Sequence, residues 1–279
     1  DSSDTHTYSF ISGSGDTDNN SFIIDGSNLI INSSPDYESK SSYNIRLKTT
    51  DSSGETYAKA FTLSVKDLNE TPSNISLSSS SFNENIAAAS IVATLSSTDV
   101  DDGDIHSYAL VEGTGSTDNN SFIIDGSNLI INSSPDYESK SSFSIRVQTT
   151  DSSGESYVEA FTLSVKDLNE TPSNISLSSS SFNENIDAAS VVATLSSTDE
   201  DDGDTHTYSF ISGAGNTDND SFAINGNNLI ILEYPDYEIK SSYNIRLQTT
   251  DSSGETFAKA FSFSVNNLNE TPLNISLSS

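Results

Sequence analysis

Carboxylates recur in this sequence in five short motifs, and oxygen-only sets of this kind suit a hard cation. In the middle of the chain the motifs read Glu84-Asn85, Asp99-Val-Asp101, Asp136-Tyr-Glu138, Asp151 and Asp167-Leu-Asn-Glu170. Their number and irregular spacing favour Ca²⁺ over octahedral Mg²⁺. Asp136 and Glu138 alone could form the carboxylate pair of a glycosidase, but their place among other acids favours metal ligation.

The overall charge is strongly acidic, with 41 acidic residues against 11 basic ones and a net charge of −30. Such a surface repels nucleic acid and anionic membranes. A salt-adapted, soluble surface would also explain the excess, so the clustering of the acids must decide between the two explanations. The chain has no Cys and only three His. A zinc site or a Ser-His-Asp triad is therefore not expected, and we predict that the chain is not an enzyme.

A repeat of 100 residues organises the chain. Residues Thr17–Ser42 recur unchanged as Thr117–Ser142, and Ala60–Ile86 recur unchanged as Ala160–Ile186. A unit of this length suits a small domain with its own core and is too long for a solenoid repeat. The chain thus reads as a segment of a longer array. The predicted domains are a partial repeat at 1–72, complete repeats at 73–172 and 173–272, and the start of a further repeat at 273–279.

Each repeat shows the alternation of apolar and polar residues that indicates β-strands. In the second repeat we predict strands at 74–78, 90–95, 106–111, 121–125, 128–131, 143–148 and 157–165. No window has helical periodicity. Seven short strands predict an all-β fold class: tandem seven-stranded antiparallel Greek-key β-sandwiches, end to end in an extended rod. The alternation of the last strand breaks at Glu159, which predicts either a β-bulge or an exposed edge position.

The alternating direction of successive strands determines at which end of a repeat each acidic motif lies. Strands that alternate in direction put Glu84, the loop 132–142 and the end of the last strand at one pole, which we call the exit pole. The opposite, entry pole of the following repeat carries Asp199, Asp201 and Asp251. The exit pole of one repeat faces the entry pole of the next, so the acids converge on the junction near Pro172. Without a cation these carboxylates would repel one another.

The same motifs resemble the cadherin repeat over the whole 100-residue unit. That family's pattern has Glu-Asn after the first strand, Asp-x-Asp after the second, Asp-x-Glu and a single Asp around the sixth, and Asp-x-Asn-Asp-x-x-Pro at the junction. Here the junction reads Asp167-Leu-Asn-Glu-Thr-Pro172, with Glu in place of the second Asp. Near-identical copies are most similar to the cadherin-like repeats of large bacterial surface proteins, including RTX-type adhesins.

The resemblance implies three Ca²⁺ ions at a complete junction. At the second junction the implied ligands are Glu84, Asp136, Glu138, Asp167, the Leu168 carbonyl, Asn169, Glu170, the Thr171 carbonyl, Asp199, Asp201 and Asp251. At the first junction the equivalents are Asp36, Glu38, Asp67, Leu68, Asn69, Glu70, Thr71, Asp99, Asp101 and Asp151. Asn267 replaces the Asp at the third junction, so Glu184, Asp236 and Glu238 would form only a partial site there.

These observations predict a Ca²⁺-rigidified extender of an extracellular or cell-surface protein, whose partners are neighbouring repeats of the same array. A carbohydrate-binding or homophilic adhesive module, with surface glycans or other copies of the chain as partners, is the alternative. Strand donation by the tail at 274–277 could also build an extracellular filament. Neither nucleic acid nor direct membrane insertion is expected.

Overall fold

The computed structural model describes residues 5–271, so the predicted start of a further repeat at 273–279 lies outside the described residues. The described residues form β-strands joined by loops, together with three short 3₁₀ turns at Asn19–Ser21, Asn119–Ser121 and Asn219–Ser221. None of the described residues forms a helix long and apolar enough to cross a membrane.

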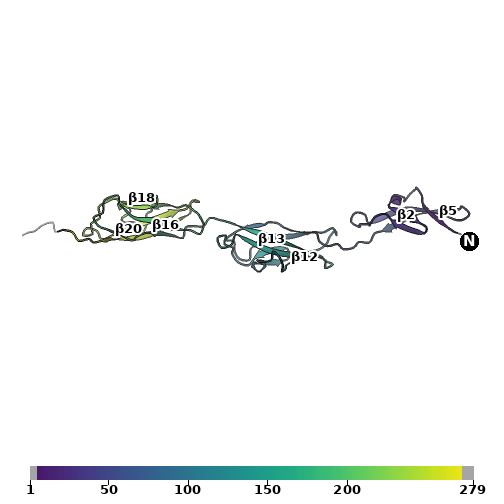
Figure 1. Ribbon diagram of the computed structural model, residues 1–279, viewed down its shortest axis with the longest axis horizontal. Helices are drawn as coiled ribbons and strands as arrows, with labels where there is room; N and C mark the ends of the chain where they lie inside the picture. Colours follow the sequence, from purple (N-terminus) through teal and green to yellow (C-terminus); the bar gives the residue numbers. More distant parts are fainter. Residues whose placement is uncertain (1–4, 272–279) are drawn as a thin grey trace, which may run out of the picture. The chain divides into compact units, whose positions relative to one another are not determined.

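The third repeat is a sandwich of two four-stranded sheets (Figure 1). Its strands are β14 (Asn174–Leu177), β15 (Ser181–Asn183), β16 (Val191–Thr198), β17 (Thr207–Phe210), β18 (Phe222–Asn225), β19 (Asn228–Ile231), β20 (Ser242–Thr250) and β21 (Thr256–Asn266). One sheet has the order β14-β16-β19-β18 and the other β15-β21-β20-β17. The inward residues of both sheets, including Leu229, Ile245 and Phe263, are fully buried and form one core.

The second repeat has the same two sheets, with the orders β10-β11-β8-β6 and β7-β13-β12-β9. Its strands are β6 (Asn74–Leu77), β7 (Ser81–Asn83), β8 (Ile91–Thr98), β9 (Ser107–Leu110), β10 (Phe122–Asp125), β11 (Asn128–Ile131), β12 (Ser142–Thr150) and β13 (Ser156–Lys166). The prediction of tandem β-sandwiches is therefore confirmed. The first predicted strand corresponds to β6, and the prediction missed the short strand β7 that follows it in the other sheet. In the third repeat its counterpart, β15, runs parallel to β21, so the sheet is not purely antiparallel.

In the first repeat the structure describes five strands: β1 (Thr7–Phe10), β2 (Phe22–Asp25), β3 (Asn28–Ile31), β4 (Ser42–Thr50) and β5 (Thr56–Ser64). They form sheets of three and two strands, β1-β4-β5 and β2-β3. Leu29 on β3 is 38% exposed, whereas Leu129 and Leu229 are fully buried. The reason is that β8 and β16 pair with the matching strands β11 and β19 in the other repeats.

The irregular pairing occurs in the second strand of the repeat rather than in the last. The register between β8 and β11 shifts where Val92 is passed over, so that Val92 and Ala93 are both buried. Ile91 consequently points outward and is 57% exposed. The strand predicted at 90–95 therefore does not alternate regularly, because the bulge reverses its phase after Ile91.

The last strand keeps its phase, and no bulge occurs at the polar residue that interrupts its apolar pattern. Lys259 on β21 pairs in register with Leu247, and the ladder continues on both sides. Its Nζ donates to the carbonyl of Ile175 at 3.0 Å and to Asn174 Oδ1 at 2.8 Å. At the same place in the second repeat, Glu159 Oε2 accepts from Ile75 N at 3.3 Å. Both residues satisfy the open edge of the first strand, and β21 lies between two strands rather than at an edge.

The chain divides into two compact units, which do not follow the sequence repeats. The first comprises residues 1–82, 87–134 and 143–164, and the second comprises 83–86, 135–142 and 165–279. The exit pole of the second repeat thus groups with the third repeat. The boundaries of the repeats at 72 and 172 remain a prediction.

The side chain of Asp218, which is 11% exposed, fixes the turn before β18. Asp218 accepts hydrogen bonds from Lys240 Nζ and from Asn244 N, the latter at 2.6 Å. Burial acts to raise the pKa of Asp218, but these two bonds hold the pKa below its ordinary value of 3.8. A lowered pKa means that the ionised carboxylate stabilises the fold.

We expect Asp218→Ala to lower the free energy of unfolding at pH 7 by about 2 kcal/mol, because the backbone N–H of Asn244 loses its acceptor in a part-buried hydrogen bond. The stabilisation by Asp218 is complete above pH 3.8 and is lost as the pH falls through the depressed pKa. Urea denaturation of both proteins at neutral and strongly acidic pH measures this difference. The exposed neighbour Asp220, changed to Ala, is the control, and an equal loss from both substitutions would contradict the prediction.

Candidate metal centres

A buried glutamate anchors the exit pole of each complete repeat. Glu84 follows β7 and is 2% exposed, and Glu184 follows β15 and is fully buried. Glu84 accepts hydrogen bonds from Tyr137 N at 2.7 Å and from Leu168 N at 2.6 Å. One carboxylate therefore joins the loop after β11 to the segment that leaves the repeat after β13. This hydrogen bonding explains how a polar side chain is tolerated at such depth.

Two further acids lie beside Glu84. Carboxylate oxygens of Glu84, Asp136 and Glu138 lie within 4.8 Å of one another. Asp136 is held by Ser139, which donates from its backbone N at 3.0 Å and from its Oγ at 2.8 Å. Burial, together with the charges of Glu84 and Asp167, raises the pKa of Glu138. The group is thus an electrostatically costly arrangement for three negative charges unless a cation or a proton compensates.

The second junction brings acids of two repeats together inside the second compact unit. Oxygens of Glu138, Glu170 and Asp201 lie within 4.8 Å of one another, and Glu170 N donates to Asp201 Oδ2 at 2.8 Å. Glu170 Oε1 accepts from Asn85, but its Oε2 is buried without a partner. Burial and the charges of Glu84, Asp201 and Glu138 raise the pKa of Glu170 to about 7. Burial and the charge of Asp201 likewise raise the pKa of Asp167.

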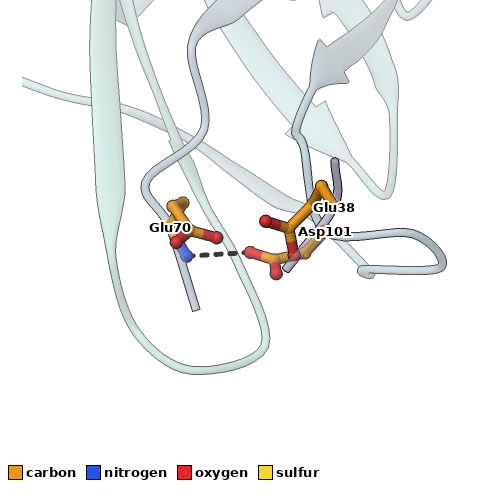
Figure 2. Close-up of side chains that lie close together, drawn as sticks. All are labelled: Glu38, Glu70 and Asp101. Atoms are coloured by element: carbon orange, nitrogen blue, oxygen red, sulfur yellow. Dashed lines mark hydrogen bonds between the residues drawn. The ribbon is translucent and has the colours of Figure 1, made fainter. Parts of the chain in front are cut away.

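The first junction repeats this arrangement inside the first compact unit. Glu38, Glu70 and Asp101 present oxygens within 4.8 Å of one another, and Glu70 N donates to Asp101 Oδ2 at 2.8 Å. Figure 2 shows the Glu38 and Asp101 carboxylates side by side and facing Glu70. Burial and the charges of Glu38 and Asp101 raise the pKa of Glu70. Asp36 is held by Ser39 in the manner of Asp136.

An asparagine from the preceding repeat reaches the entry pole of the following one. Asn69 Nδ2 donates to Asp151 Oδ2 at 2.9 Å, and Asn169 Nδ2 donates to Asp251 Oδ2 at 3.0 Å. The hydrogen bond from Asn69 lowers the pKa of Asp151. Because the amide oxygen and nitrogen of Asn exchange places on rotation by half a turn, the same side chain can present Oδ1 to a cation.

The side chains of Asp99 and Asp199 in the entry pole are only 3% and 5% exposed. Asp99 Oδ2 is 3.1 Å from His106 Nε2, and Asp199 Oδ2 is 2.8 Å from His206 Nε2. Each histidine thus orients an aspartate that is a predicted ligand.

Asp104 is an acid that the sequence reasoning left out of the predicted ligands. It lies with Asp99 and Asp151 in one group whose oxygens are within 4.8 Å of one another. Its recurrence as Asp204, after the same Asp-x-Asp-x-Gly run, was the signal that could have found it. The leucines and threonines assigned as carbonyl ligands, Leu68, Thr71, Leu168 and Thr171, are exposed residues of the same connecting segments.

The exit pole of the third repeat differs in one important contact. Glu184, Asp236 and Glu238 again lie within 4.8 Å of one another. There, however, Asn267 Nδ2 donates to Glu238 Oε1 at 3.0 Å, in the position that Asp67 and Asp167 occupy in the other repeats. An amide removes one negative charge and supplies a hydrogen bond, so this cluster depends less on a cation.

The donor set fits Ca²⁺ in its chemistry. Carboxylates, an Asn amide and nearby carbonyls are all oxygen donors, which hard cations prefer, and no thiol is present in the sequence. A buried unpartnered oxygen on Glu170 and raised pKa values on Glu70, Glu138 and Glu170 indicate that the clusters lack a compensating charge. Glu38, Glu70 and Asp101 would hold an ion at the first junction, and Glu84, Glu138, Glu170 and Asp201 would do so at the second.

Comparison with known proteins supports cadherin-like repeats. No family model matches the chain. Among curated proteins, the chain is 28% identical to mouse Protocadherin Fat 4 over 260 residues, which is 88% of this chain. It is 29% identical to mouse Protocadherin Fat 2 over 232 residues, or 77% of this chain. The chain spans only 5% of the length of each of these relatives.

Solved cadherin structures share the fold. Extracellular cadherin domains 3–6 of Protocadherin Gamma B2 match 94% of this chain with a TM-score of 0.66 and 18% identity, covering 66% of that structure. Mouse Cadherin-23 EC22–24 matches 95% of this chain with a TM-score of 0.62 and 20% identity, covering 86% of that structure. At these identities the likeness shows the fold: a tandem array of cadherin-type β-sandwiches.

Proposed function

We propose that this chain is a calcium-stiffened spacer of a large extracellular surface protein or adhesin, with Ca²⁺ bound where successive repeats meet. The observation that carries the proposal is the group of Glu138, Glu170 and Asp201, which draws carboxylates from two consecutive repeats into 4.8 Å. Two unit charges at that separation repel by roughly 3 kcal/mol at an effective dielectric constant of about 20. A shared cation turns this repulsion into a tie between the repeats.

Three further features support a spacer over a catalyst. The predicted ligands recur at both junctions with the same backbone contact, from Glu70 N to Asp101 and from Glu170 N to Asp201. The repeats are near-identical in their loops, which suits a structural role better than recognition of distinct ligands. The curated relatives are protocadherins by name, and the structural neighbour from Protocadherin Gamma B2 consists of extracellular cadherin domains. A bacterial surface array remains part of the proposal because near-identical copies are similar to such proteins.

Self-association is the second candidate, favoured by a structural neighbour described as a cis-dimer, Protocadherin gammaB7 EC3–6. It matches 94% of this chain at a TM-score of 0.64. The same solution experiment can test both functions, because scattering reports mass as well as flexibility.

Removal of calcium is expected to loosen the chain without unfolding its repeats. Small-angle scattering with about 2 mM Ca²⁺, above the roughly 10⁻⁴ to 10⁻³ M affinities of extracellular sites, should give a stiffer particle than scattering after chelation. Circular dichroism should show the β-sheet signal retained in both conditions. An unchanged scattering profile on chelation would rule out the spacer mechanism. A mass above that of the single chain, lost on chelation, would favour self-association.

A further inference from the structure

We propose that Asp104 and Asp204 are additional cation ligands, each completing an ion position built by the entry-pole loops of its own repeat. The inference rests on the proposed calcium function and adds a residue that the cadherin-type motifs used above do not contain. It is carried by the geometry around Asp104 and by the recurrence of that geometry at Asp204.

The three acids of this position come from one repeat. Asp99 and Asp104 lie in the loop between β8 and β9, and Asp151 opens the turn between β12 and β13. Their carboxylate oxygens approach within 4.8 Å of one another without any residue of the preceding repeat. The position therefore differs from the Glu138, Glu170 and Asp201 group, which needs two repeats.

Protein groups already satisfy most oxygens of Asp99 and Asp151. Asp151 Oδ1 accepts backbone N–H groups from Ser153, Gly154 and Glu155 at 2.7 to 2.9 Å. Asp151 Oδ2 accepts from Asn69, and Asp99 Oδ2 contacts His106. These bonds fix the orientation of two of the three carboxylates at the proposed ion site.

Asp104 is different, because one of its oxygens is buried and has no partner. Its Oδ1 accepts from Ser152 Oγ at 2.8 Å, which fixes the plane of the carboxylate, while its Oδ2 is buried without a hydrogen bond. Asp204 repeats both features, with Ser252 Oγ at 2.6 Å and a buried, unpartnered Oδ2. A buried carboxylate oxygen without a donor requires explanation, and a bound cation is the explanation that its acidic neighbours favour. The same orphaned atom thus recurs in two repeats that share the same loop sequence.

Asp204→Asn tests this assignment in the intact chain, with Asp202→Asn as the matched control. Asp202 lies in the same loop, carries the same charge and is exposed. Calcium titration calorimetry should show one class of site weakened on the order of 100-fold by Asp204→Asn and no change from Asp202→Asn, since affinity depends on the number of charged ligands. Ser252→Ala removes only the hydroxyl that orients Asp204, and should weaken the same class about tenfold.

Thermal unfolding in chelator checks that each variant is folded. If the Asp204→Asn protein does not fold, calcium binding by the Ser252→Ala protein tests the assignment instead. The assignment would be overturned if the Asp204→Asn and Asp202→Asn proteins bound calcium equally. If Asp204→Asn is unfolded, unchanged calcium binding by the Ser252→Ala protein would overturn it. Either outcome would leave the proposed function intact. No calcium uptake by the unsubstituted chain would instead overturn the proposed function itself.

Discussion

The double variant Asp167→Ala, Asp201→Ala is expected to stay loose at the second junction at a calcium concentration that stiffens the unsubstituted chain. Both residues carry charge into the same group, because the charge of Asp201 helps raise the pKa of Asp167. Removing two of the carboxylates should weaken calcium binding at this junction on the order of 100-fold or more. Sites that bind at roughly 10⁻⁴ to 10⁻³ M would then be empty near 1 mM calcium.

The absence of Cys allows this loosening to be measured directly. Spin labels on cysteines introduced at the exposed positions Thr162 and Ser209 report the distance between the second and third repeats. With calcium, the unsubstituted pair should give a narrow distance distribution and the double variant a broad one. Each repeat should keep its unfolding transition, because neither acid belongs to the hydrophobic core.

A charge-matched control separates ligand loss from a general change in charge. Asp125 and Asp220 are exposed and lie outside the acidic groups described above, so Asp125→Ala, Asp220→Ala removes the same charge. If this control broadens the distribution as much as the double variant does, surface charge rather than a shared cation sets the stiffness of the junction.

The strands could be predicted from the sequence where one face is buried and the other is exposed. On β12 the side chains of Phe143, Ile145 and Val147 are buried, as their alternation with polar residues predicts. Alternation fails where two apolar residues are adjacent. Val92 and Ala93 give no sign of which one faces the core, and the bulge buries both.

Polar residues on an inward face are hard to predict for a different reason. Glu159 and Lys259 have opposite charge, and each reads as an interruption of the apolar pattern. Their function appears only when the neighbouring sheet is known, because each hydrogen-bonds to the backbone of the first strand across the sandwich. A contact of this kind joins residues more than 80 positions apart, and local sequence carries no record of it.

The acidic groups, too, could be predicted from the sequence only in part. Strand parity was sufficient to expect acids at both poles, since it depends only on the count and direction of strands. It could not tell Asp104, which keeps a buried unpartnered oxygen, from its exposed neighbour Asp102. Nor could it show that Glu84 is almost completely buried whereas Asp136 is exposed. Depth and hydrogen-bond satisfaction depend on how three separate loops pack together.

The depth of Glu84 leads to a large expected effect on stability. Glu84→Ala leaves the backbone N–H groups of Tyr137 and Leu168 without their acceptor. Each donor left unsatisfied away from water costs about 1–3 kcal/mol, so the loss of these two part-buried bonds should cost the second repeat about 2–6 kcal/mol of unfolding free energy. Urea denaturation with and without calcium measures this loss. In the presence of calcium the loss should be larger, because a cation ligand disappears as well.

Glu184→Ala is the matched comparison that separates hydrogen bonding from metal binding. Glu184 accepts the equivalent bonds from Tyr237 and Leu268, and these bonds lower its pKa. Its cluster, however, has Asn267 where that of Glu84 has Asp167. In chelator the two variants should lose similar stability. With calcium, Glu84→Ala should lose more than Glu184→Ala, because the third cluster is already relieved by the amide of Asn267. Equal losses in both conditions would mean that Glu84 serves the fold alone and takes no part in binding the cation.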